Sequence, residues 1–252
     1  MPQTTPVPAS PDLISAATLL RQVPAAQWRP GLSHADSTLH GEIFASSQDT
    51  SGAAVALAFA QDHLHAAAPG SRAKVPDERP WLWVQDRETL RRTGRPYRPG
   101  LPRPLRHRLI HVATTSVEDA LFALEEGLRC RELAFVIGEI TGNPRALDMT
   151  AARRLGLAAE KHGVPLWLVR IDARRDLSPA RQRWEVRAAA SPEPRWNAAA
   201  PGTPSWRAEL FRARRHPPGT WILRDDGVLA AEPVTGPASA NTDPEPPCEV
   251  LC

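Results

Sequence analysis

The residues between His40 and Ala54 have the types and spacing that most resemble a catalytic or binding motif. A short apolar strand over residues 42–45 leads into a small polar loop, and an apolar helix follows over residues 53–65. This order frames the loop G-x-x-x-x-G-K-[ST], whose backbone amides cradle phosphates while its Lys and hydroxyl reach the terminal phosphate and magnesium. Here Gly52 stands near the second glycine position, but Ala53 and Ala54 replace the Lys and the hydroxyl residue. The sequence therefore predicts a degenerate phosphate-binding loop that does not hydrolyse ATP.

Two carboxylates near the ends of later apolar runs could have belonged to the same nucleotide site. Asp86 follows the run at 81–85, and Glu139 comes just after the run at 133–137. Mg²⁺ is usually held by one or two carboxylates together with the phosphates of the substrate. Without a loop to hold phosphates these two have little to coordinate. We interpret them as structural residues, with a residual metal or nucleotide site as the alternative, and we expect no metal site and no cofactor.

The elements that must position these residues alternate along the chain. Short apolar runs at 42–45, 81–85, 109–113, 133–137 and 166–171 are typical of strands in a parallel sheet covered on both faces. Between them, apolar stripes predict helices at 117–130 and 147–162, and another helix is predicted at 11–23. From about residue 181 the pattern becomes alternating, which predicts antiparallel strands at one edge of the sheet, near 184–188, 206–211, 221–224 and 228–230.

Composition and charge limit the class of protein. The 252 residues are 42% hydrophobic, enough for a sizeable core, and no apolar run approaches the roughly 18 residues of a membrane span. Three cysteines are too few for a disulfide framework, which favours the cytoplasm. The net charge of +3 conceals an asymmetry, because residues 170–224 hold 12 Arg against 5 acids, whereas residues 231–252 hold four acids and no base.

The basic C-terminal region allows three interpretations. Its arginines and tryptophans could grip single-stranded DNA through phosphate contacts and stacking. The same residue types are enriched at protein–protein hot spots, and they could also form no more than a solvated face over a Trp-rich core. The candidate partner or DNA-binding residues are Arg181, Arg183, Trp196, Trp206, Arg212, Arg214 and Arg215.

Several stretches of the sequence resemble the ImuA family, RecA-like bacterial proteins of damage-inducible mutagenesis cassettes. The resemblance covers about residues 12–230 and is carried by residues 83–88, 94–97, 119–130, 147–155, 195–197 and 204–210. It implies an α/β fold of the RecA-like type, a three-layer sandwich with a mainly parallel sheet and antiparallel C-terminal strands. It also implies a role in SOS-induced translesion synthesis beside an ImuB-type polymerase-like subunit and an error-prone replicative-type polymerase. RecA is a further candidate partner. The expected location is the cytoplasm, in association with the nucleoid, and direct contact with DNA is left open.

Taken together, residues and resemblance predict three parts of the chain. Residues 1–30 form an N-terminal tail and helix, residues 31–230 a RecA-like core with the degenerate loop, and residues 231–252 a disordered, acidic, proline-rich tail. We expect a non-catalytic scaffold protein. A residual ATP-binding relative of RecA and a SulA-like inhibitor of cell division are the alternatives.

Overall fold

The computed structural model describes residues 39–49, 51–66, 77–194, 196–197, 199–214, 216–226 and 229–234. The helix predicted at 11–23, Arg215, and the predicted tail from residue 235 onward lie outside the described residues. Within the described residues, no helix is both long and apolar enough to cross a membrane.

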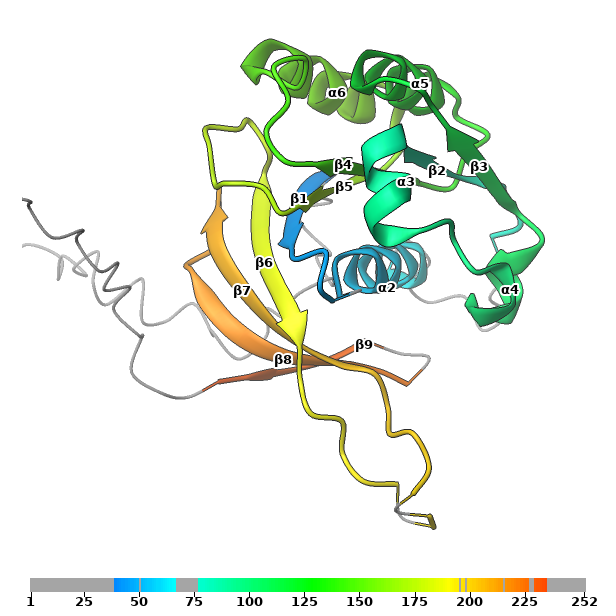
Figure 1. Ribbon diagram of the computed structural model, residues 1–252, viewed down its shortest axis with the longest axis vertical. Helices are drawn as coiled ribbons and strands as arrows, with labels where there is room; N and C mark the ends of the chain where they lie inside the picture. Colours follow the sequence, from blue (N-terminus) through cyan, green and yellow to red (C-terminus); the bar gives the residue numbers. More distant parts are fainter. Residues whose placement is uncertain are drawn as a thin grey trace, which may run out of the picture.

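One nine-stranded sheet organises the described residues, in the order β3-β2-β4-β5-β1-β6-β7-β8-β9 (Figure 1). The strands are β1 (His40–Ala45), β2 (Trp81–Gln85), β3 (Leu109–Ala113), β4 (Val136–Thr141), β5 (Leu166–Ile171), β6 (Gln182–Ala188), β7 (Ser205–Ala213), β8 (Gly219–Asp225) and β9 (Leu229–Pro233). Strands β1 to β6 pair in parallel, and β7, β8 and β9 are added antiparallel. The predicted α/β class, with a mainly parallel sheet and antiparallel C-terminal strands, is confirmed.

Strand β6 corrects one detail of that prediction. We expected an antiparallel flank from about residue 181, but β6 lies parallel to β1, with Ile43 opposite Trp184. The chain turns antiparallel only at β7. Alternation of side chains along β6 could not reveal this, because alternation is the same for a strand in either direction.

Helices cover both faces of the parallel part (Figure 1). The helices are α2 (Ser51–Ala66), α3 (Arg87–Thr93), α4 (Arg103–Arg106), α5 (Val117–Arg129) and α6 (Met149–His162), with a 3-10 turn at Arg98–Gly100. Helix α2 lies on one face, and α5 and α6 lie side by side on the other. Alternate residues of β2, β4 and β5 therefore enter two separate apolar clusters, one with α2 and one with α5 and α6.

The α2 side of the core explains most of the tryptophans. Phe59 of α2 packs against Trp167 and Trp184, with ring centroids 5.1 and 5.2 Å apart. Trp206 of β7 is buried in the same cluster. Aromatic side chains of this size dominate the apolar area that a sheet and helix can remove from water. The antiparallel strands are therefore a continuation of the core over the same face.

Strand β4 begins later than predicted. We expected residues 133–137, but the strand runs from Val136 to Thr141, and Leu133 lies buried in the loop before it. Burial, not strand geometry, explains the apolar character of that loop. As a result Glu139 lies inside the strand, where its side chain is enclosed.

Local chemistry explains both ends of helix α6. Helix α6 starts at Met149, not Leu147, because the side chain of Asp148 caps it by accepting a hydrogen bond from the backbone N–H of Ala151. It ends at Gly163, which adopts the left-handed conformation at φ 71°. At the other end of the chain, β9 continues to Pro233, three residues into the segment predicted as a tail.

Candidate functional site

A cleft of about 460 Å³ opens at the carboxyl ends of β1, β2 and β4, where an α/β sheet of this type binds its ligands. The start of α2 contributes Gly52, Ala53 and Ala54, and β4 contributes Glu139. The structure thus brings together four of the five positions predicted for a degenerate nucleotide site. Asp86, the fifth, is not among the residues that line the cleft.

The loop before α2 has already used the backbone amides that would hold a phosphate. The N–H of Ser47 donates to the carboxylate of Asp172 at 2.9 Å, and the N–H of Ser51 donates to the carboxylate of Asp49 at 2.8 Å. The N–H of Gln48 donates to the hydroxyl of Ser46. In a phosphate-binding loop these groups point at the ligand instead. These three amides of the loop are therefore bound by the protein's own acceptors.

The carboxylates of Asp49, in this loop, and of Asp172, just after β5, are held in their charged form. Hydrogen bonds from Ser47 lower the pKa of Asp172. Burial acts to raise the pKa of Asp49, but hydrogen bonds from Ser51 and from the backbone N–H of Ala188 outweigh it and leave that pKa lowered. Asp49 thus places a negative charge in the lining of the cleft, and Asp172 places another on the amide of Ser47, where it also pairs with Arg92. They oppose an anion in addition to occupying its donors.

Gly52 has a packing role. A Cβ added to it would come within 2.7 Å of Val169 and 2.8 Å of Ala45. The absent side chain therefore lets the first turn of α2 approach β1 and β5 closely. Its backbone does not need the left-handed region that glycines in tight loops supply. The glycine is explained without a ligand.

Asp86 is the N-cap of α3. Its side chain accepts hydrogen bonds from the backbone N–H of Glu88 and from the hydroxyl of Thr89. Capping of this kind satisfies amides that a helix leaves unpaired at its start. The carboxylate is buried and committed to that role. This placement supports the structural interpretation of Asp86.

Glu139 forms the floor of the cleft together with residues that the sequence did not single out. Burial raises its pKa to about 7, while hydrogen bonds from Gln85 (2.7 Å) and Thr93 (3.2 Å) act in the opposite direction. Gln85 in turn contacts the ring of His111, with 2.9 Å between Oε1 and Nε2. A clue to Gln85 exists in the sequence, since it is the polar residue that closes an otherwise apolar strand. These hydrogen bonds hold the side chains of Glu139 and Gln85 in place at the cleft wall.

The remaining walls of the cleft are mostly apolar, with the guanidinium groups of Arg92 and Arg95 among them. Leu57, Trp83, Leu101 and Ile171 line it, and Arg92 at its rim is bound to Glu88 and Asp172. Among the described residues, no group of three or more His, Cys, Asp or Glu side chains gathers as metal ligands would. The cleft has the size of a ligand site but offers mainly apolar contact and a few neutral hydrogen bonds.

Arg183, predicted to bind a partner or DNA, is instead part of a buried charge cluster. Its Nε donates to the carboxylate of Glu42 at 2.7 Å, and Ser178 donates to the same carboxylate at 2.6 Å. The Arg183 side chain is 3% exposed. Its guanidinium also lies 5.0 Å from the ring of Phe44. Burial and the pairing with Glu42, 141 residues away in the sequence, leave Arg183 little surface to offer a partner or DNA.

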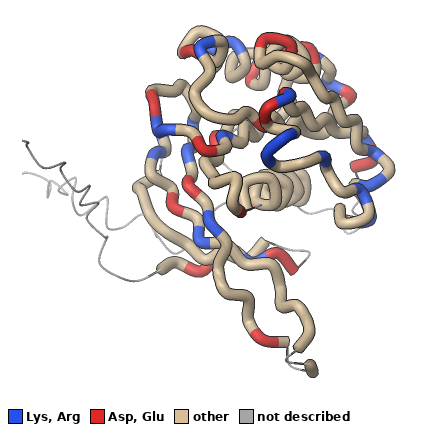
Figure 2. The backbone as a smooth tube through the Cα atoms, viewed as in Figure 1, with Lys and Arg blue, Asp and Glu red and all other residues tan. Residues whose placement is uncertain are grey.

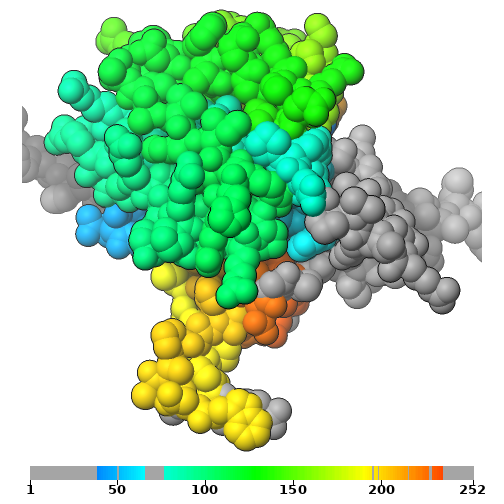
Figure 3. Space-filling model, turned by 90° about the vertical axis from the view of Figure 1, so that its right-hand side faces the viewer, coloured from blue at the N-terminus to red at the C-terminus, as the bar shows by residue number. Residues whose placement is uncertain are grey.

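Of the two tryptophans predicted to bind a partner or DNA, Trp206 is buried and Trp196 is exposed. Trp206 is 8% exposed and packs in the core beneath β7. Trp196 is 96% exposed and lies in the connection between β6 and β7, an arm that projects away from the body of the molecule (Figure 3). At the tip, the N–H of Ala200 donates to the carbonyl of Asn197, which closes a turn beside Trp196.

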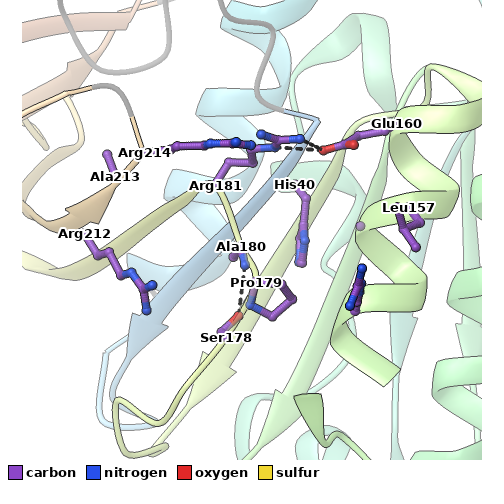
Figure 4. A pocket seen from close by; sticks show the side chains of 12 residues that line it. His40, Leu157, Glu160, Ser178, Pro179, Ala180, Arg181, Arg212, Ala213 and Arg214 are labelled. Atoms are coloured by element: carbon purple, nitrogen blue, oxygen red, sulfur yellow. Dashed lines mark hydrogen bonds and ion pairs between the residues drawn. The ribbon is translucent and has the colours of Figure 1, made fainter. Parts of the chain in front are cut away.

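The other four predicted arginines differ in what the structure shows of them. Arg181, Arg212 and Arg214 line a second hollow, of about 540 Å³, between α6 and the ends of β6 and β7 (Figure 4). We call this hollow the arginine groove. Arg215 lies outside the described residues. The groove is lined by His40, Arg153, Gly156, Leu157, Glu160, Ser178, Pro179, Ala180, Arg181, Arg212, Ala213 and Arg214.

Comparison with known proteins gives one kind of relative. No family model matches the chain. Over 127 residues, 46% of this chain, the sequence is 35% identical to protein ImuA of Caulobacter vibrioides, equally in strains NA1000 / CB15N and ATCC 19089 / CB 15. The matched region is 50% of each relative, so the chain spans about half the length of the curated relatives it matches.

Proposed function

We propose that this chain is a non-catalytic accessory protein of damage-inducible mutagenesis. Its similarity to ImuA over 127 residues supports this proposal. It would act by holding partners together. Those partners would be an ImuB-type polymerase-like subunit, an error-prone replicative-type polymerase and RecA. The site would then be a remnant of a nucleotide site, kept for its part in the fold.

The single observation that carries this proposal is the pairing of the loop before α2 with Asp49 and Asp172. Phosphoryl transfer depends on charge neutralisation and on amides aimed at the phosphates. Here the amides of Ser47 and Ser51 are occupied, and no Lys stands at position 53. The loop therefore lacks groups through which a phosphate-binding loop stabilises the transferring phosphate, and this supports a non-catalytic role.

The sheet supports a common origin with RecA-like ATPases. A parallel core followed by an antiparallel flank is the arrangement of that group, and the strand ends converge on the degenerate loop. Fold alone does not fix function, so this argument supports the ancestry of the site and not its present use.

The arm between β6 and β7 is the surface best suited to a partner protein. It presents Trp196 to solvent at 96% exposure, while five other tryptophans are buried in the core. Exposed tryptophans of this kind are the commonest anchors of protein–protein interfaces. We therefore place the main partner contact at Trp196.

A complementation experiment tests the proposal. In a strain that lacks this gene, damage-induced mutation frequency is measured with the unmodified chain, with Glu139→Gln and with Trp196→Ala. We expect Glu139→Gln to restore mutagenesis and Trp196→Ala to fail, at equal protein levels. Trp206→Tyr, a conservative core change, controls for loss of tryptophan as such. Loss of mutagenesis with Glu139→Gln alone would favour a catalytic role and contradict the proposal.

A further inference from the structure

The arginine groove concentrates unpaired positive charge. Four arginines and one carboxylate line it, and the carboxylate of Glu160 is bound by Arg181 alone (Figure 4). Within the described part of the chain, the guanidinium groups of Arg153, Arg212 and Arg214 form no ion pair. Burial lowers the pKa of His40, so its ring adds no charge at neutral pH.

Other arginines of the same sheet are not available in this way. Arg175 pairs with Glu185 and Glu209, and Arg187 pairs with Glu185 as well. Figure 2 shows blue and red segments close together along β6 and β7. The excess of arginine that the sequence shows is therefore largely neutralised on the open face of the sheet, and it remains free at the groove.

The lining of the groove favours carboxylates over a nucleic acid. Arginine matches both carboxylates and phosphates, and Arg181 already binds one carboxylate here through two nitrogens. Single-stranded nucleic acid also needs aromatic faces on which bases stack, and the only ring in the lining is the buried His40. Leu157 (55% exposed), Pro179 and Ala213 instead offer contacts to aliphatic side chains. This combination fits an acidic peptide.

The chain itself carries such a peptide within reach. Residues 243–249 include Asp243, Glu245 and Glu249, with no basic residue after position 224. The last described residue, Val234, donates its N–H to the carbonyl of Thr220, at the end of the sheet where β7 delivers its arginines to the groove. Val234 lies two strand spacings across the sheet and three residues along β7 from Arg212. The two residues are therefore roughly 15 Å apart. The nine residues to Asp243 can span about 30 Å.

We propose that the acidic segment 243–249 of this same chain binds in the arginine groove, where its carboxylates pair with Arg153, Arg212 and Arg214. The chain thereby covers its own most basic surface. Any anionic partner of the groove must then displace this segment. The inference rests on the charge and geometry of the groove and is independent of the proposed function.

Disulfide trapping tests this with a thiol that the segment already contains. Cys130 and Cys252 are changed to Ser in the full chain, which leaves Cys248, and Leu157→Cys places a thiol in the groove. Phe122→Cys, on the exposed face of α5 at 67% exposure, is the matched control. Disulfide formation under mild oxidation is followed on non-reducing gels and located by mass spectrometry, after circular dichroism confirms folding.

We expect the groove thiol to form an intramolecular disulfide with Cys248 about tenfold faster than the control, because binding raises its effective concentration. The advantage should disappear in 1 M NaCl, where the Debye length is about 3 Å, and with Arg212→Gln/Arg214→Gln or Asp243→Asn/Glu245→Gln/Glu249→Gln. Equal rates for both thiols, or a rate that ignores these charge changes, would overturn the proposal. A disulfide found only between two chains would overturn it too, since the occupant would be a second copy.

Discussion

The carboxylate of Asp172 accepts a hydrogen bond from the backbone N–H of Ser47 at 2.9 Å, across 125 residues of sequence. Asp172 reaches this position with φ at 49°, in the left-handed region that aspartate tolerates better than most residues. The contact ties the end of β5 to the loop after β1. It also occupies an amide of that loop with a carboxylate of the protein.

Restoring the missing side chains should therefore not restore nucleotide binding. We predict that Ala53→Lys/Ala54→Thr binds ATP no better than the unmodified chain by isothermal titration calorimetry. The reason is that Asp49 and Asp172 still occupy the loop amides. Adding Asp172→Asn to these two changes is the informative companion, because it removes one charge. Tight binding by the first variant would show that the amides are free.

Glu139 should make stability depend on pH. Its pKa is about 7 in the folded chain, above the ordinary 4.5. Between pH 4.5 and pH 7 the folded state therefore keeps a proton on Glu139 that the unfolded state has lost. Stability from this group is complete below pH 4.5 and is lost as pH rises through 7. We predict that Glu139→Gln gains roughly 1–3 kcal/mol relative to the unmodified chain between pH 5 and pH 8. Urea unfolding at both pH values measures this, and a constant difference would refute it.

The pair of Glu42 and Arg183 should be costly to break. Both side chains are almost completely buried, so Arg183→Met leaves a carboxylate without its main partner. We predict a loss of about 3–5 kcal/mol in the free energy of unfolding, with much of it recovered in Glu42→Gln/Arg183→Met. Arg181→Met is the control, because its pair with Glu160 is exposed and should be worth less than about 1 kcal/mol. Similar losses for Arg181 and Arg183 would contradict the assignment.

Two tryptophans that look alike in the sequence should behave in opposite ways. Trp206→Ala removes a buried core residue and should cost about 3–5 kcal/mol of stability. Trp196→Ala removes an exposed residue and should change stability by less than about 0.5 kcal/mol. Thermal and urea unfolding of the two variants compare them directly. A large loss for Trp196→Ala would mean that the arm packs against the body.

The sequence predicts most of the sheet because its strands are continuous apolar runs. Strands 81–85, 109–113 and 166–171 are found with the predicted bounds. The start of β4 is missed because the buried loop around Leu133 is equally apolar. The sequence also does not reveal that Arg183 is buried, since Arg181, just before the strand, is an equally plausible candidate and only Arg183 donates to Glu42.

In the candidate site, too, the sequence predicts what a local motif determines and misses contacts between residues far apart in the chain. Ala53 and Ala54 reveal the loss of the phosphate-binding loop, because that loop is a local motif. The hydrogen bonds of Ser51 with Asp49 and of Gln48 with Ser46 are local, but Ser47 donates to Asp172 across 125 residues of sequence and Ala188 donates to Asp49 across 139. No spacing in the sequence indicates such pairs. The arginine groove is equally non-local, since Arg153 comes from α6 and Arg212 from β7.

ATP turnover by the purified full chain, with and without single-stranded DNA, tests the central claim most directly. We predict no hydrolysis above the background of a mock preparation, because the phosphate-binding amides are occupied and the catalytic Lys is absent. DNA-stimulated turnover that disappears in Glu139→Ala would contradict the account, since it would show that the cleft still works as an ATPase site.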